Sequence, residues 1–456
     1  MKKTPPPKKP LVHFIGIGGI GMSSLAQWFM AQNWAVTGSD ITRSLITHDA
    51  AKRGVKVKIG PQKASNLPSR TSLVIRTQAV KPDNPEYAAA RHRKVPIMTY
   101  PEIVGQLTDE YRTVAVAGAH GKSTTTAFMA LLLERAKLDP TVIIGTRLKE
   151  FGENNFRPGH GPWLVLEADE YGKAFLNYTP TIAIITNIDK EHLDTYGRLA
   201  GVKRAFLTFI GRILPGGALI VNADDKNTVS LKSRTLKIAR KNHVEVIWYS
   251  RRSPLAAKLR KVLKIPGEHN VSNALAAMAA AKLFHIPEKN ALVTLGIYRG
   301  SWRRFDRRGS FRDAIVFDDY AHHPTEIKAT LQGFRARFPK KKIICVYEPH
   351  QAERLRRLWP EFQTCFDLAD ELVMLPIYRV AGRDNREHPT YNSRNLAALV
   401  AKRNPKKTVR YLPDYRKLGK TLVALSPAPL RDKVIVMMGA GTIAEHTKGL
   451  LKHSRQ

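Results

Sequence analysis

The stretch VAVAGAHGKSTTTAF constrains the fold most, because an apolar run meets a glycine turn that opens directly into a helix-like segment. Backbone N–H groups at such a helix start point toward an anion, and the helix dipole favours negative charge. Gly121, Lys122 and Ser123 match the end of a phosphate-binding loop, with Gly118 as its earlier glycine and Val116 where the usual first glycine stands. The flanking strand and helix favour a phosphate site over a simple helix cap. In such a site Lys122 reaches the outer phosphates and the Ser123 hydroxyl ligates Mg²⁺.

The same alternation of apolar runs and helical segments continues through all 456 residues. It predicts an α/β fold whose parallel sheets are joined by crossover helices. The length suggests about three domains at roughly 150 residues each. We expect a disordered basic arm at residues 1–10, an N-terminal Rossmann-like domain at 11–108, a central P-loop-type domain at 109–302 and a C-terminal Rossmann-like domain at 303–456.

The composition bounds the class of partner. The chain carries 75 Lys and Arg against 38 Asp and Glu, a formal net charge of +37. Nucleic-acid binding is one interpretation of this charge, but the basic residues are dispersed and no nucleic-acid-binding motif accompanies them. We favour a basic surface on a protein with anionic substrates. No apolar stretch of about 18 residues or a secretory signal is evident, so we expect a cytoplasmic protein without membrane insertion.

A second glycine turn lies near the N-terminus. Gly16, Gly18 and Gly21 form a G-x-G-x-x-G pattern between a strand and a helix, and Asp40 ends the next strand. This pattern indicates a diphosphate at the helix start. It leaves open whether the diphosphate belongs to NAD(H) or to a UDP-sugar.

Acidic residues and a histidine follow two neighbouring strands of the central region. Such groups at adjacent strand ends can hold divalent ions against a nucleotide, although helix caps and a solvated rim would use the same residues. The set comprises Glu167, Asp169, Asp189, Glu191, His192 and Asp194.

Three further motifs follow along the chain. Asn270 and Asn273 lie one helical turn apart, where their amides can read a base edge or serve as a cap and a surface residue. Five arginines between Arg299 and Arg308 suit either phosphate binding at a hinge or a solvated linker. The segment FDDYAHHPTE places charged and aromatic groups where α/β sheets bind ligands, at the carboxyl end of a strand.

The ordered set of motifs resembles the Mur ligase family over nearly the whole chain. The matching segments are HFIGIGGIGMS, AGAHGKSTTT, EADE, TNIDKEHLD, GEHNVSNALAA, RRFD, DDYAHHPTE and the final GAG. The resemblance implies an ATP- and Mg²⁺-dependent ligase that activates a carboxylate as an acyl phosphate, which an amine then attacks. Within the family, GIGGIGM and DDYAHHPTE favour the branch that joins L-alanine to UDP-N-acetylmuramate in peptidoglycan synthesis.

The resemblance also implies the roles of particular residues. The residues implied to bind the UDP-sugar are Gly16, Gly18, Gly19, Gly21, Met22, Ser23, Asp40 and Thr77. For ATP they are Gly118, Ala119, His120, Gly121, Lys122, Ser123, Thr124, Asn270, Asn273, Arg304 and Asp319, with Asp319 on the ribose. Catalysis is expected from Lys122, His192 and Arg304, metal binding from Ser123, Glu167 and His192, and alanine binding from Tyr320, His322 and Arg354.

The chain departs from the family pattern at a few positions. Ser123 replaces the usual Thr and keeps the hydroxyl, Tyr171 and Gly172 stand where an Asp is common, and Gln351 stands where many relatives have Arg. Three alternatives remain: a relative that attaches a whole recycled peptide, a Rossmann dehydrogenase that uses the N-terminal glycines, and a nucleic-acid-stimulated ATPase. We expect a monomer or a homodimer.

Overall fold

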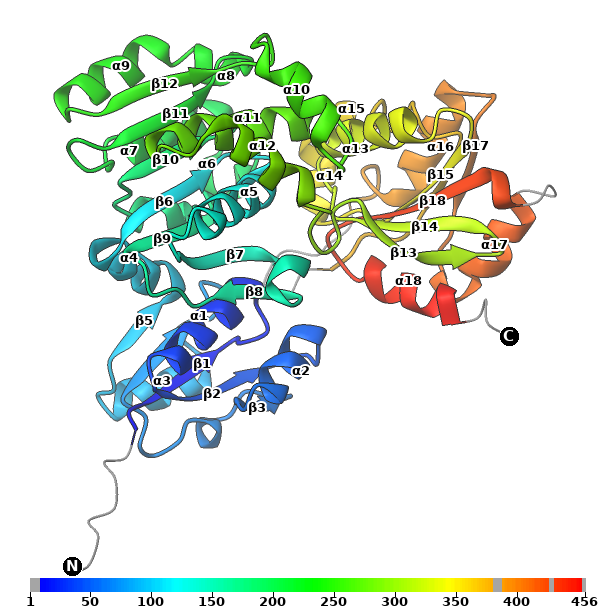
Figure 1. Ribbon diagram of the computed structural model, residues 1–456. Coiled ribbons are helices and arrows are strands. Elements are labelled where there is room, and N and C mark those ends of the chain that lie inside the picture. The colour runs from blue at the N-terminus through cyan, green and yellow to red at the C-terminus, as the bar shows by residue number, and fades with distance from the viewer. Residues whose placement is uncertain (1–8, 380–387, 426–429, 453–456) are drawn as a thin grey trace, which may run out of the picture. The chain divides into compact units, whose positions relative to one another are not determined.

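The computed structural model describes residues 9–379, 388–425 and 430–452, and its chain path is shown in Figure 1. The chain forms two compact units, Met1–Val262 with Val271–Tyr298, and Leu263–Asn270 with Arg299–Gln456. The first unit contains a five-stranded and a seven-stranded sheet, and the second contains a six-stranded sheet. The fold is therefore a three-domain α/β arrangement of mostly parallel sheets. Most of the predicted arm, residues 1–8, lies outside the described residues.

The N-terminal sheet has the strand order β3-β2-β1-β4-β5, and all of its pairs are parallel. This is the order of a doubly wound nucleotide-binding sheet, in which ligands bind at the carboxyl ends of the strands. Asp40 ends β2, as the sequence predicts. The elements are β1 (Leu11–Ile15), α1 (Ile20–Ala31), β2 (Ala35–Asp40), α2 (Leu45–Lys52), β3 (Lys56–Ile59), β4 (Leu73–Arg76), α3 (Pro85–His92), β5 (Ile97–Thr99) and α4 (Tyr100–Glu110).

The central sheet has the order β12-β11-β10-β6-β9-β7-β8, in which β7 and β8 form the antiparallel edge. Strand β6 lies between β9 and β10, so the chain segments that follow those two strands flank the glycine loop after β6. The strands are β6 (Arg112–Ala117), β7 (Thr141–Leu148), β8 (Asn154–Arg157), β9 (Trp163–Glu167), β10 (Ile182–Ile185), β11 (Ala218–Asn222) and β12 (Glu245–Tyr249). The helices are α5 (Lys122–Arg135), α6 (Leu193–Tyr196), α7 (Leu199–Ile210), α8 (Lys226–Val229), α9 (Lys232–Lys241), α10 (Leu255–Val262), α11 (Glu268–Leu283) and α12 (Glu288–Ile297).

The second unit has the strand order β13-β14-β18-β15-β16-β17, and only β13 runs antiparallel to its neighbour. Helix α13 begins at Pro324, where the fixed φ of proline suits a first helical turn. The strands are β13 (Asp306–Phe311), β14 (Ala314–Asp319), β15 (Lys342–Tyr347), β16 (Glu371–Met374), β17 (Thr408–Tyr411) and β18 (Lys433–Met438). The helices are α13 (Pro324–Arg337), α14 (Ala352–Arg357), α15 (Trp359–Phe362), α16 (Ser393–Arg403), α17 (Leu418–Leu425) and α18 (Ile443–Lys452).

One hydrophobic core runs through both sheets of the first unit. Phe29 of α1 and Phe156 of β8 belong to the same buried cluster, which continues to Phe206 of α7. Burial of this apolar surface is what holds the N-terminal and central sheets together.

The predicted domain boundaries at residues 108 and 302 stay predictions. By contacts, the chain divides between Tyr298 and Arg299, and Leu263–Asn270 groups with the second unit. Across the described ranges, no helix has both the length and the apolar character needed to cross a membrane.

Candidate active site

The phosphate loop, Gly118–Gly121, connects β6 to α5 and has a backbone that requires glycine at two positions. Gly118 has φ +135°, and a Cβ there would lie 2.1 Å from Thr186 Oγ1. Gly121 has φ +85°, and a Cβ there would lie 2.3 Å from Asn273 Oδ1. Residues other than glycine rarely adopt such φ values, and the neighbouring atoms leave no room for a Cβ at either position.

The residues that follow β10 hold this loop in place. Thr186 Oγ1 donates to His120 O at 2.6 Å, and Asn187 Nδ2 donates to the same carbonyl at 2.9 Å. The His120 N–H donates back to Asn187 Oδ1 at 2.9 Å, and His120 Nε2 lies 3.0 Å from Asp189 Oδ2. The sequence analysis singled out Asp189 but missed Thr186 and Asn187. Their signal was their place in TNID, directly after a strand that pairs with β6.

Lys122 folds back over the loop that precedes it. Its ammonium donates to Gly118 O at 2.7 Å and to Glu170 Oε2 at 2.9 Å, and it lies 3.8 Å from Asp169 Oδ1. The Glu170 side chain is 1% exposed and the Lys122 side chain 15% exposed, so water reaches this ion pair only from the Lys122 side. The sequence analysis did not assign a role to Glu170, the last residue of EADE.

The charges around Lys122 shift several pKa values. Burial acts to lower the pKa of Lys122, but the negative charges of Glu170 and Asp169 outweigh it, so the pKa is raised. Burial raises the pKa of Glu170 despite the nearby Lys122 ammonium. The Asp169 side chain is 54% exposed; partial desolvation of its carboxylate is outweighed by the charges of Lys122 and His192, and the pKa is lowered. Lys122 is therefore held as a cation at the point where a phosphate loop needs positive charge.

His192, Asp169 and Glu170 form a compact group in which one ligand atom from each lies within 4.8 Å of the others. His192 precedes α6 with φ +52°, and its Nε2 is 3.8 Å from Glu170 Oε1 and 4.0 Å from Asp169 Oδ1. Within the described part of the chain, His192 Nδ1 and Glu170 Oε1 are buried without a hydrogen-bond partner. Burying a polar atom unpaired is costly, so Glu170 Oε1, which lies 3.8 Å from His192 Nε2, fits a ligand of a divalent cation.

The other predicted metal and nucleotide residues have the following contacts. Glu167 Oε1 accepts a hydrogen bond from Gly145 N at 2.8 Å. Ser123 and Thr124 are both buried in the first turn of α5. Asn273 lies against Gly121 of the phosphate loop. Asn270 donates to Pro266 O at 2.6 Å within the second unit. Ala119 N donates to Asn187 O at 3.2 Å.

The N-terminal glycine turn is shaped by residues at the ends of β2 and β4. Gly16 has φ +84°, and a Cβ there would lie 2.5 Å from Thr77 Cγ2. The Asp40 carboxylate accepts a hydrogen bond from Gly18 N at 2.8 Å, so it links the end of β2 to the glycine turn. Gly21 lies against the Tyr100 ring, with 2.9 Å between the ring and an added Cβ.

Three further predicted residues of this turn lie on or before α1. Gly19 is the N-cap of the helix, and Met22 is buried in the hydrophobic core. Ser23 is also buried and accepts a hydrogen bond from Asn155 of β8 at 2.9 Å. Met22 and Ser23 thus have contacts inside the protein that account for their burial.

In the second unit, Asp319 is bound by protein donors. Its carboxylate accepts from Phe305 N at 2.8 Å, Ala321 N at 3.0 Å and Thr330 Oγ1 at 3.1 Å, and burial raises its pKa. Arg304, predicted at the phosphoryl group, lies with its guanidinium carbon 5.5 Å from the centre of the Tyr320 ring.

The three residues predicted for alanine gather at the carboxyl ends of β14 and β15. Tyr320 and His322 have ring centres 5.3 Å apart, and His322 lies 5.7 Å from the His350 ring. Arg354 Nη1 is 3.2 Å from His350 Nδ1. Gln351 is the N-cap of α14 and has φ +72°, a backbone conformation that few non-glycine residues adopt. The structure thus brings Tyr320, His322 and Arg354 together through His350, which the sequence analysis did not assign.

Comparison with known proteins gives family matches along almost the whole chain. Residues 11–112 match the model described as "Mur ligase family, catalytic domain", residues 116–281 the "Mur ligase middle domain", and residues 303–441 the "Mur ligase, glutamate ligase domain".

Curated relatives and a solved structure agree with these matches. The chain is 35% identical to a UDP-N-acetylmuramate--L-alanine ligase of Clostridium kluyveri, with 96% of each chain covered. It is 38% identical to one of Desulfosudis oleivorans, covering 83% of this chain and 84% of that protein. It resembles the crystal structure of a UDP-N-acetylmuramate-alanine ligase from Thermotoga maritima, with a TM-score of 0.79, 27% identity, and 97% and 99% of the two chains covered. The chain belongs to the Mur ligase family.

Proposed function

We propose that the protein is an ATP-dependent ligase that joins L-alanine to the lactoyl carboxylate of UDP-N-acetylmuramate. The products are UDP-N-acetylmuramoyl-L-alanine, ADP and phosphate, and the reaction belongs to peptidoglycan synthesis in the cytoplasm. The observation that carries the proposal is Lys122, a partly buried cation at the start of α5 in a chain whose curated relatives are named for this reaction.

The chemistry needs this loop because a carboxylate is a poor electrophile at neutral pH. Transfer of the γ-phosphoryl group of ATP to the carboxylate gives an acyl phosphate, and the alanine amine then displaces phosphate. Several anionic groups meet in the first step, so positive charge must offset their repulsion. The loop N–H groups and Lys122 supply it, once Lys122 exchanges Gly118 O for a phosphate oxygen.

The group formed by Asp169, Glu170 and His192 fits Mg²⁺. Glu170, Asp169 and His192 would hold the ion, and Ser123 and Glu167 remain the ligands predicted by resemblance. A bound Mg²⁺ would supply additional positive charge at the phosphates. If Lys122 bound a phosphate of ATP in place of Glu170, the Glu170 carboxylate would be available as a cation ligand.

The second unit is our proposed source of the amino-acid pocket. Arg354 provides a cation, and Tyr320 and His322 provide aromatic rings; together these groups suit a small zwitterion. Arg304 stays our predicted contact for the transferring phosphoryl group, and Asp319 for the ATP ribose.

The test is phosphate release from ATP with UDP-N-acetylmuramate and, in separate reactions, L-alanine, glycine, L-serine or a γ-D-glutamyl tripeptide. We expect release that requires both the UDP-sugar and L-alanine, and that is lost in Lys122→Met. Lys241→Met, which removes an exposed cation on α9, is the matched control and should retain activity. Preference for the tripeptide would move the protein to the peptide-attaching branch, and no release with any pair would refute the proposal.

A further inference from the structure

The contact between α1 and β8 includes one buried side chain that crosses from the central sheet to the glycine-turn helix. Asn155 of β8 is 4% exposed. Its Nδ2 donates to Ile20 O at 2.6 Å and to Ser23 Oγ at 2.9 Å, and its Oδ1 accepts from Gln27 Nε2 at 3.0 Å. All three partners are on α1, and Ile20 begins that helix directly after the glycine turn.

We propose that Asn155 is a positioning residue, which fixes the UDP-sugar-binding turn relative to the ATP phosphate loop so that the two reacting groups are aligned. This inference rests on the proposed function, because it takes the two glycine turns as the two ligand sites. Asn155 lies in β8 and belongs to neither glycine turn. It acts through α1 on one side and through the sheet on the other.

The path from Asn155 to the phosphate loop runs through three strand pairings, the first of which has a register shift beside Asn155. Strand β8 pairs with β7, β7 with β9, and β9 with β6, which leads into Gly118. On the other side, Asn155 binds the first turn of the helix whose N-cap is Gly19. Both glycine turns are therefore joined to Asn155 by hydrogen-bonded secondary structure.

The remainder of the contact is less specific. Apolar packing of Phe156 and the α1 core residues holds the domains together, but hydrophobic contact is not directional and permits sliding. An ion pair between Arg147 Nη1 and Asp49 Oδ2, at 2.8 Å, adds a second link, from β7 to α2.

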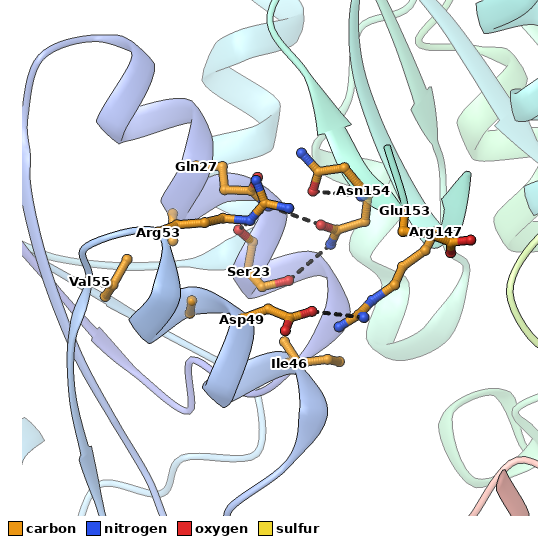
Figure 2. A pocket seen from close by; sticks show the side chains of 12 residues that line it. Ser23, Gln27, Ile46, Asp49, Arg53, Val55, Arg147, Glu153 and Asn154 are labelled. Atoms are coloured by element: carbon orange, nitrogen blue, oxygen red, sulfur yellow. Dashed lines mark hydrogen bonds and ion pairs between the residues drawn. The ribbon is translucent and has the colours of Figure 1, made fainter. Parts of the chain in front are cut away.

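Figure 2 shows Ser23 and Gln27 of α1 facing β8, and Asp49 facing Arg147. A small cavity of about 20 Å³ lies among these polar groups, so packing alone does not fill the junction. Hydrogen bonds weaken steeply when distance or angle changes, and three of them to one amide define the position of α1 on β8.

The test compares Asn155→Leu with the wild-type protein in ligand binding and turnover. A misplacement of about 1 Å can cost roughly 100-fold in rate, whereas each ligand still meets an intact turn. We expect kcat for phosphate release to fall about 10- to 100-fold. The Kd values of ATP and of UDP-N-acetylmuramate, each measured alone, should stay within about threefold of wild type.

Asn242→Leu is a control for the loss of an amide–carbonyl hydrogen bond elsewhere in the central domain. Asn242 donates its side-chain amide to Gly211 O at 3.0 Å at a half-buried position away from the α1 contact. This variant loses one hydrogen bond, against three at Asn155, and should keep kcat. Gln27→Met combined with Asn155→Leu should be no slower than Asn155→Leu alone, because both substitutions break the same link.

A readout that needs no activity is amide hydrogen exchange at residues 20–24. Faster exchange there in Asn155→Leu, but not in Asn242→Leu, is expected. Equal loss of kcat in the two variants, an unchanged kcat in Asn155→Leu, or a change confined to one Kd would overturn the inference. If the wild-type protein shows no UDP-sugar-dependent release, the proposed function fails, while exchange still reports whether Asn155 fixes α1.

Discussion

Gly118→Ala tests whether the phosphate loop is held by its fit against Thr186. Alanine at φ +135° carries a backbone cost on the order of 1–3 kcal/mol. Its Cβ would lie 2.1 Å from Thr186 Oγ1, so Thr186 must move and give up its 2.6 Å bond to His120 O, worth about 1 kcal/mol. The sum is about 2–4 kcal/mol if the variant keeps the native loop.

The protein can avoid this cost by displacing the loop, which moves the N–H groups that would bind phosphate. At about 1.4 kcal/mol per factor of ten, we expect ATP affinity to fall by roughly 30- to several hundred-fold. Titration calorimetry with ATP measures this directly, and the affinity for UDP-N-acetylmuramate should stay near wild type.

Gly54→Ala provides the control, because Gly54 has φ +97° but no atom within 4 Å of an added Cβ. It carries a backbone cost of similar kind without a collision, and it should leave ATP affinity unchanged. If Gly118→Ala binds ATP within about twofold of wild type, the claim that the fit at Thr186 fixes the loop is wrong.

Three further predictions concern stability and its pH dependence. Burial raises the pKa of Asp318 to about 6, so the folded protein binds a proton there that the unfolded chain has lost. The free energy of unfolding should therefore fall by up to about 3 kcal/mol as the pH rises from about 4 to 6. Thermal unfolding should show this fall in the wild-type protein and not in Asp318→Asn. Burial acts to raise the pKa of Glu86, but its hydrogen bonds with His13, Ser39 and Asn66 outweigh burial, so the pKa is lowered. The stability that ionised Glu86 contributes is present above about pH 4.5 and is lost as the pH falls through the pKa of Glu86 in the folded protein. The difference in free energy of unfolding between wild type and Glu86→Gln, measured in urea, should therefore disappear below that folded-state pKa. Phe175→Ala removes a fully buried ring that stacks on Phe209 at 4.8 Å and should cost about 3–5 kcal/mol in urea unfolding, and a cost below about 1 kcal/mol would contradict the packing argument.

Much of the local structure was readable from the sequence. The predicted strand, glycine turn and helix are found at Gly16 and at Gly118, since glycine turns after apolar runs leave few backbone alternatives. Asp40 lies at the end of its strand, as predicted, because that position follows from the neighbouring residues alone.

The partners of the site residues could not be read in the same way. Thr186 and Asn187 brace the phosphate loop only because β10 pairs with β6, which the order of segments along the chain does not state. Glu170 was missed for a similar reason. Its role as the partner of Lys122 depends on β9 lying on the other side of β6.

The sequence by itself determined the α/β class, the two glycine turns and the residue types available at each strand end, because these depend on short-range backbone preferences and on hydrophobic periodicity. Only the tertiary structure decided which of those residues meet. Strand order places Glu170 at Lys122 and Asn155 at α1, although each pair is far apart in the chain. Such contacts form only when burial of the shared core orders the sheet, so no local pattern can encode them.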